Sequence, residues 1–267
     1  SKGKILPVER FIKSFKEQSL RLADSAFGQT VSGKWVYQSE VIDYVEEDLF
    51  MVPDLSTIRK IPWNKEPTAQ IICDLNYPSG EPSKLAPRQV LKNIIEKLSD
   101  EQLQAVVAPE LEFYLCEQNL DPDLPLKTPI GKSGRRETGS RVFGIDAVNE
   151  FDKLTDDIYD YCELMHIGVD TLVHESGPSQ IEINLNHGDP LALADQAFMF
   201  KRAVRQVALK HNIHATFMAK PYQGQPGSSM HIHQNLVSAK TGRNLFSDKD
   251  GNNSKEFFHF IGGLQTY

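Results

Sequence analysis

The sequence predicts a fold that mixes helices with strands and is organised in two parts. Short β-branched and aromatic runs, broken by Pro, Gly and Asn, fill residues 1–84. The Pro- and Gly-rich stretch YPSGEPSKLAPRQ marks the boundary, and helical and strand patterns alternate through residues 85–267. With 267 residues, 40% of them hydrophobic, the chain is long enough to bury one large core or two smaller ones.

The first part is expected to be β-rich with one early helix. The helix pattern is PVERFIKSFKEQ, and the strand patterns are GKWVYQS, LFMVPD, TIRKIPW and TAQIICDLN. The opening SKGKILPV is also strand-like, and the closing FFHFIGGLQTY stops within an apolar helical pattern. We therefore expect the chain to be part of a longer protein.

The second part is expected to start with the helix PRQVLKNIIEKL, which carries its apolar residues on one side. Next come the strand QAVVAPELEFYLCE, the loop DPDLPLKTPIGKSGRRETGSR, the helix NEFDKLTDDIYDYCELM and the hairpin-like pair TLVHESGPSQIEINLN. Asp189 and Pro190 are typical of the N-cap and first residue of a helix, LALADQAFMFKRAVRQVALKHN, which precedes the strand HATFMAKP.

Composition and charge exclude several classes of partner. The net charge of −7 argues against a nucleic-acid-binding protein, because phosphate binding needs a basic face. No apolar run approaches the length that crosses a membrane, and the N-terminus lacks a signal-peptide pattern. Cys73, Cys116 and Cys162 are widely spaced and set in apolar surroundings. They predict buried reduced thiols and a cytoplasmic location.

The first candidate functional residues lie in the predicted strand PELEFYL. Its period of two sends Glu110 and Glu112 to the same face, opposite Leu111, Phe113 and Leu115. Acidic residues are common on the solvated side of an antiparallel sheet, and this strand alone favours that interpretation.

Two further strands repeat the arrangement. In SQIEINLN, Glu182 alternates with apolar residues, and Glu175 lies across the Ser-Gly-Pro-Ser turn. In SSMHIHQNL, His231 and His233 alternate with Met230 and Ile232. If the strands share one sheet, carboxylates with one or two imidazoles converge on a site that suits Mg²⁺ or Mn²⁺. A bound cation also offsets the repulsion between paired glutamates.

Other catalytic motifs are missing from the sequence. The loop GKSGRRETGS lacks the spacing of a phosphate-binding P-loop and is expected to be a flexible surface connection. There is no Gly-x-Ser-x-Gly elbow and no cysteine paired with an evident base, so covalent nucleophilic catalysis has no support.

Taken together, four segments resemble the glutamine synthetase family in their order and spacing. They are APELEFYL, HESGPSQIEINL, TFMAKPYQGQPGSSMHIHQNL and FIGGLQTY, and the likeness covers nearly the whole chain. The resemblance implies an α+β fold: a small β-grasp-like N-terminal domain over residues 1–84, then a catalytic domain over residues 85–267 built on a curved antiparallel sheet with flanking helices. It also implies self-association into rings, expected to be dodecamers.

The resemblance assigns roles to individual residues. It implies that Glu112, Glu175 and Glu182 hold one divalent cation, and that Glu110 and His231 hold a second. Gly227 matches a glycine that holds the glutamate substrate, and His233 and Asn235 fall where the family contacts ATP. Glu175 is also expected to shape the site that receives the amine, as a catalytic residue.

The implied activity is an ATP-dependent ligase that joins the γ-carboxylate of glutamate to an amine through a γ-glutamyl phosphate. Pro226 and Ser229, and the stretch Arg141–Phe143, depart from ammonia-using members in the manner of γ-glutamylpolyamine synthetases. We therefore expect an organic mono- or polyamine as the acceptor. The alternatives are a glutamine synthetase that uses ammonia, a two-metal phosphohydrolase, and a non-catalytic ring-forming family member.

Overall fold

The computed structural model describes residues 2–36, 47–121 and 123–266. The chain divides into two compact units, the first formed by residues 1–58 and 69–96 and the second by residues 59–68 and 97–267. Part of the predicted strand GKWVYQS lies outside the described residues. The boundary expected between residues 84 and 85 stays a prediction.

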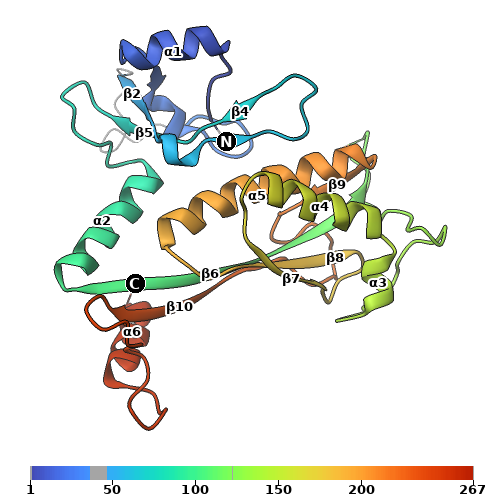
Figure 1. Cartoon of the computed structure of the whole chain (residues 1–267). Helices are drawn as coiled ribbons and strands as arrows, with labels where there is room; N and C mark the ends of the chain where they lie inside the picture. Colours follow the sequence, from blue (N-terminus) through green and yellow to red (C-terminus); the bar gives the residue numbers. More distant parts are fainter. Residues whose placement is uncertain (1, 37–46, 122, 267) are drawn as a thin grey trace. The chain divides into compact units, whose positions relative to one another are not determined.

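The first unit contains a three-stranded antiparallel sheet in the order β1-β2-β5 (Figure 1). Its elements are α1 (Val8–Lys16), β1 (Arg21–Ala23), the 3₁₀ turns Asp24–Gly28 and Leu55–Thr57, β2 (Asp48–Pro53), β4 (Ala69–Gln70) and β5 (Cys73–Asn76). The strand predicted for SKGKILPV is wrong, because residues 2–7 form no strand and Ile5 is 99% exposed.

Two other predicted strands are shorter than expected. TIRKIPW contains only β3 (Arg59–Lys60), and the run ends before Pro62, which has no backbone N–H to offer a ladder. HATFMAKP contributes only part of β9 (Ile213–Thr216), and residues 217–229 form a loop. Helix α2 (Pro87–Asp100) follows its prediction closely and crosses the boundary between the units.

The second unit is built on a five-stranded antiparallel sheet. The order is β10-β6-β8-β7, and β9 pairs with β6 beyond the end of β8. The strands are β6 (Leu103–Glu117), β7 (Val169–His174), β8 (Gln180–Leu185), β9 and β10 (Met230–Ser238). The helices are α3 (Ile145–Asn149), α4 (Asp152–Leu164), α5 (Pro190–Lys210) and α6 (Lys255–Thr266). The helix predicted over residues 149–165 is confirmed as α4, and the short helix α3 that precedes it was not predicted.

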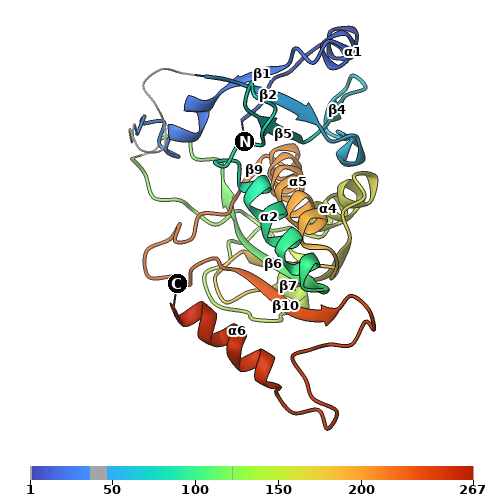
Figure 2. The same cartoon turned by 90° about the vertical axis from the view of Figure 1, so that its left-hand side faces the viewer.

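Helices α4 and α5 pack side by side and cover one face of this sheet (Figures 1 and 2). The predicted apolar face of β6 is buried there, with Leu111, Phe113 and Leu115 at most 1% exposed. The matching residues of β8 are buried as well, and α5 adds Phe200. Burial of this apolar face stabilises the sheet and leaves its other face for polar side chains.

The start of helix α5 was predicted correctly from its N-cap and first residue. The Asp189 carboxylate accepts a hydrogen bond from the Ala192 backbone N–H at 2.9 Å, and Pro190 is the first helical residue. The β7–β8 hairpin is also confirmed, with a turn at residues 175–179. The chain therefore mixes helices with antiparallel sheets, as expected, while the β-grasp description of the first unit stays a prediction.

All three cysteines are free thiols. Cys116 and Cys162 are buried as predicted, whereas Cys73 is only half-buried. Burial raises the pKa of the Cys162 thiol to about 12. Among the helices of the described residues, none has the length and apolar character needed to cross a membrane.

Candidate active site

The register of the sheet brings the predicted polar residues together on its face away from α4 and α5. Glu110 in the middle of β6 lies opposite His231 of β10 and Asn184 of β8. Glu112 lies opposite Glu182 of β8. Because directly opposed residues share a face and side chains alternate with a period of two, the side chains of all these residues are on one side.

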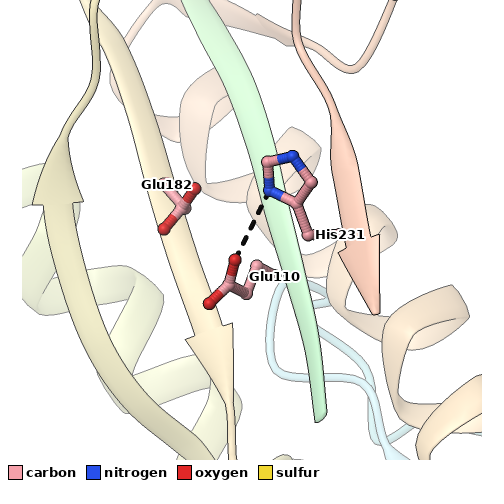
Figure 3. A group of neighbouring side chains, drawn as sticks. All are labelled: Glu110, Glu182 and His231. Carbon is pink, nitrogen blue, oxygen red and sulfur yellow. Dashed lines mark ion pairs between the residues drawn. The ribbon is translucent and has the colours of Figure 1, made fainter. Parts of the chain in front are cut away.

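Glu110, Glu182 and His231 form the centre of the group and come from three different strands (Figure 3). One ligand atom of each lies within 4.8 Å of the others. His231 Nδ1 is 3.4 Å from Glu110 Oε2 and 3.9 Å from Glu112 Oε1. Carboxylate oxygens with one imidazole are a donor set that fits Mg²⁺ or Mn²⁺.

The electrostatics of the group also fit a cation. Burial raises the pKa of Glu182, and the neighbouring charges of Glu110, Glu175 and Glu112 raise it further. His231 opposes this shift only in part, since the net direction is upward. A divalent cation among these oxygens would offset the repulsion between them.

Glu112 is held in one orientation by two protein donors. Its Oε2 accepts hydrogen bonds from the Gln180 side-chain amide at 3.0 Å and from the Ser229 backbone N–H at 3.1 Å. The other oxygen, Oε1, is the one near His231. The side chain is 8% exposed, so this carboxylate is nearly buried with one oxygen directed at the group.

Glu175 lies at the turn of the hairpin and is less closely associated. Its Oε2 accepts hydrogen bonds from the backbone N–H of Ser176 at 2.9 Å and from the hydroxyl of Ser176 at 3.2 Å. It is outside the group of mutually close ligand atoms, although its charge contributes to the raised pKa of Glu182. Its predicted role as a cation ligand stays a prediction.

His233 and Asn235 follow His231 on the same face of β10. His233 Nε2 is 2.8 Å from Glu110 Oε1, so Glu110 lies between the two histidines. Asn235 Oδ1 accepts a hydrogen bond from the side chain of Asn244 at 3.0 Å. Their predicted contacts with ATP stay predictions.

Gly227 lies in the loop before β10, where the chain doubles back on itself. A Cβ at this position would be 2.8 Å from the carbonyl oxygen of Ala219, and the next backbone N–H, of Ser228, bonds that oxygen at 2.9 Å. A side chain therefore does not fit without movement of the backbone. The predicted contact of Gly227 with glutamate stays a prediction.

Several residues that support the site were missed at the sequence level. Gln180 is fully buried and contacts Glu112, and the Tyr114 hydroxyl donates to the Pro226 carbonyl at 2.8 Å. The alternation of β8 places Gln180 on the same face as Glu182, a signal that was available. Asn184, which donates to Glu110 Oε1 at 3.3 Å, follows the same alternation.

The expected flexible loop at residues 131–140 is corrected by Glu137, whose side chain is only 9% exposed. One oxygen, Oε2, accepts from the Ser179 backbone N–H at 2.5 Å and lies 2.8 Å from His174 Nε2. His174 is 1% exposed and precedes Glu175 directly. The loop is therefore anchored to the hairpin by a buried carboxylate.

Comparison with curated proteins identifies several relatives of this chain. The chain is 34% identical over 266 residues to the gamma-glutamylputrescine synthetase PuuA of Escherichia coli, covering 98% of this chain and 56% of that protein. It is 30% identical over 271 residues to a glutamate–isopropylamine ligase of Pseudomonas, with 98% and 57% covered. A glutamine synthetase of Pyrococcus abyssi is 34% identical over 219 residues, with 82% and 46% covered. The chain thus spans about half the length of these relatives.

Solved structures share the fold. The structure described as apo GmaS without ligand superposes with a TM-score of 0.78 at 23% identity, covering 98% of this chain and 57% of that one. A glutamine synthase homologue gives a TM-score of 0.78 at 19% identity. The glutamine synthetase catalytic-domain model matches residues 84–267, and the chain belongs to the glutamine synthetase family.

Proposed function

We propose that the protein containing this chain is an ATP-dependent ligase that joins the γ-carboxylate of glutamate to an organic mono- or polyamine. The observation that carries the proposal is the convergence of Glu110, Glu182 and His231 from three strands of a family catalytic domain. The required cofactors are ATP and two or more Mg²⁺ or Mn²⁺ ions per site. Bound cations would neutralise phosphate oxygens of ATP.

The residues divide between two cation positions and two substrates. Glu112, Glu175 and Glu182 would hold one cation, and Glu110 and His231 the other. His233 lies close to Glu110, which supports a contact with a phosphate next to that cation. Gly227 would bind glutamate, and Asn235 would contact the nucleotide.

The proposed reaction has two steps. A γ-carboxylate oxygen of glutamate forms a bond to the γ-phosphorus of ATP, and the bond to the ADP oxygen breaks. The amine nitrogen then forms a bond to the γ-carbonyl carbon, phosphate leaves, and the nitrogen loses a proton. Glu175 would attract the cationic form of the amine and accept the proton that must leave before the nitrogen can attack, because its charge acts at the site. The second proton, lost from the nitrogen after attack, would leave with the phosphate.

The acceptor is the finer part of the proposal. Pro226 has no backbone N–H, and the loop that carries Arg141, Val142 and Phe143 is joined to the hairpin through the Phe143 N–H and the His174 carbonyl at 3.0 Å. The names of two relatives, at 34% and 30% identity, support an amine. A glutamine synthetase is also 34% identical, over a shorter match of 219 residues, so ammonia is the second candidate.

The assembly and organisation are proposed with the activity. We infer a β-grasp-like domain over residues 1–84, a catalytic domain over residues 85–267, and cytoplasmic rings of the dodecameric type. Sedimentation of the full-length protein tests the assembly, since a monomer would contradict it.

An ADP-release assay on the full-length protein tests the activity. It would contain glutamate, Mg²⁺ or Mn²⁺ and, in turn, ammonia, monoamines or polyamines. The proposal expects ADP only when glutamate and an amine are both present. Equal turnover with ammonia would favour the glutamine synthetase alternative. Phosphate release from a phosphoester without an amine would favour a phosphohydrolase, and no turnover in a stable ring would favour a non-catalytic member.

Two substitutions test the site in the same assay. Glu112→Ala and His231→Ala should each lower cation-dependent ADP release by about 100-fold or more, because each removes a proposed ligand. Glu163→Ala, on the exposed side of α4, is the matched control and should leave activity unchanged. Retained activity in both site variants would refute the cation assignment.

A further inference from the structure

The Gln180 side chain is a fully enclosed polar group beside the site. It is 0% exposed and lies at the start of β8, where the hairpin turn ends. Its amide contacts three segments that are distant in the sequence: the turn at Gly177, strand β6 at Glu112 and the loop at Gly227.

The hydrogen bonds determine which end of the amide faces which partner. Gln180 Oε1 accepts from the Gly177 backbone N–H at 2.8 Å, and an N–H can only donate. Gln180 Nε2 donates to the Gly227 carbonyl at 2.9 Å and to Glu112 Oε2 at 3.0 Å, and a carbonyl can only accept. The Ser228 hydroxyl lies 3.3 Å from the same nitrogen. Only a side chain with both a donor and an acceptor satisfies this arrangement.

Glu112 needs such a partner because it belongs to a group of like charges. Its own charge helps to raise the pKa of Glu182 across the sheet. The donors Gln180 and Ser229 hold Glu112 Oε2 on the protein side, so that Oε1 stays near His231. Without the Gln180 donor, rotation of the carboxylate away from Glu182 and Glu110 would relieve repulsion and withdraw Oε1.

We propose that Gln180 is a positioning residue that holds Glu112 toward the cation position and Gly227 toward the glutamate position through one buried amide. This inference rests on the proposed function for the identity of the two ligands. The geometry that carries it is the pair of bonds from Nε2, which join β6 to the loop before β10. One side chain thereby links the cation half of the site to the substrate half.

The test is a Mn²⁺ titration of the full-length protein, followed by electron paramagnetic resonance without nucleotide or glutamate. Gln180→Leu removes every bond at similar volume. Gln180→Glu keeps an acceptor for the Gly177 N–H but loses donors to Glu112 and Gly227. Both should weaken Mn²⁺ binding by about 10- to 100-fold, the usual cost of losing a partner that orients a ligand. Gln180→Glu should also raise the KM for glutamate.

Gln196→Leu is the matched control. Gln196 is a half-buried amide on α5, the helix on the opposite face of the sheet, and its Oε1 accepts from the Gly168 backbone N–H at 2.9 Å. Its loss should leave Mn²⁺ binding as in the wild type. If Gln180 only stabilised the fold, all three variants would lower the unfolding free energy and the folded proteins would bind Mn²⁺ alike.

Unchanged Mn²⁺ affinity in folded Gln180→Glu would overturn the inference, even if Gln180→Leu did not fold. The result is independent of ligase activity, because the titration needs no turnover. A wild-type protein that bound Mn²⁺ without ligase activity would overturn the proposed reaction and leave the expected difference between variants in place. A wild type that bound no Mn²⁺ would overturn the cation assignment and this inference together.

Discussion

The cluster of acidic residues and histidines has two sides that differ in burial and bonding. We call them the hairpin side, with Glu112 and Gln180, and the β10 side, with His231 and His233. On the hairpin side, Glu112 is 8% exposed and Gln180 is 0% exposed, and each is bound by several protein donors or acceptors. On the β10 side, the side chains of His231 and His233 are 57% and 66% exposed. Buried polar groups require partners, whereas exposed ones keep water as an alternative.

The comparison indicates which parts of the site are fixed by the fold. The hairpin side has its geometry before any ligand binds, because moving a buried carboxylate would break bonds to β8 and to the loop before β10. The β10 side is open to solvent and can adjust when a cation or nucleotide arrives. Changes on the hairpin side should therefore lower the unfolding free energy, and changes on the β10 side should affect ligand binding alone.

Gly177→Ala should have the largest effect on stability. An added Cβ would lie 1.8 Å from the Tyr114 hydroxyl oxygen, and Tyr114 is fully buried against Tyr222. Because neither ring nor turn can move freely, we expect a loss of about 3 kcal/mol in unfolding free energy, measured by urea denaturation. Gly139→Ala, with no atom within 4 Å of its Cβ, is the control and should stay within about 0.5 kcal/mol of the wild type. Equal stability of the two variants would mean that the turn at Gly177 is loosely packed.

Glu137→Gln should have the next largest effect on stability. Burial raises the pKa of Glu137, but hydrogen bonds from His174 and the Ser179 N–H outweigh it, so the pKa lies below its usual range. Loss of these charge-assisted bonds should cost about 2 kcal/mol at pH 7. Glu117→Gln, which breaks an exposed pair with Arg136 at 2.8 Å, is the control and should change stability little.

The pH dependence of the same pair of proteins gives a second check. A carboxyl group whose pKa is lower in the folded than in the unfolded state stabilises the fold at pH values above the unfolded pKa, which is roughly 4.3 for glutamate. This contribution is lost as the pH falls through the folded pKa. The difference in unfolding free energy between wild type and Glu137→Gln should therefore shrink between roughly pH 5 and pH 3. A constant difference over this range would contradict a charged Glu137.

Tyr114→Phe should have a smaller effect. Burial first, then the charges of Glu112 and Glu175, raise the Tyr114 pKa to about 12, so the hydroxyl is a neutral donor to the Pro226 carbonyl. Its removal should cost about 1 kcal/mol. Tyr222→Phe is a close control, because the Tyr222 hydroxyl is buried and bonds to no group in the part of the chain that the structure describes. The unfolding free energy of Tyr222→Phe should equal or slightly exceed that of the wild type. An equal loss of unfolding free energy in both variants would show that the hydrogen bond to Pro226 does not stabilise the fold.

Periodicity was sufficient to predict the faces of β6 and β8. Apolar residues alternate with Glu110, Glu112 and Glu182, and the apolar face is buried as expected. The sequence did not show that α5 is the helix that covers it. The same pattern did not reveal that Met230 and Ile232 of β10 are 46% and 47% exposed. Alternation defines two faces of a strand, but whether an element covers either face depends on the tertiary arrangement.

Register was beyond the reach of the sequence. A slip of two residues between β6 and β8 would keep both apolar faces buried but place Glu112 opposite Gln180 or Asn184 instead of Glu182, and nothing in either strand alone excludes it. The supporting residues were missed for a related reason. Gln180 and Glu112 are 68 positions apart, and Glu137 and Ser179 are 42 apart. Such contacts follow from the paths of loops, which local propensity does not specify.

His231→Ala should have the smallest effect on the metal-free protein, within about 0.5 kcal/mol, because the side chain is 57% exposed and can be replaced by water. The same unfolding measurement is then repeated with Mn²⁺ present. A cation present at 100 times its dissociation constant should stabilise the wild type by about 2.7 kcal/mol, since it binds the folded state only. His231→Ala should lose most of that gain, whereas His187→Ala, at an exposed position outside the group of ligand atoms, should keep it. An equal Mn²⁺ gain in both variants would show that the cation is held by the hairpin side alone, and that the open β10 side contributes nothing to its binding.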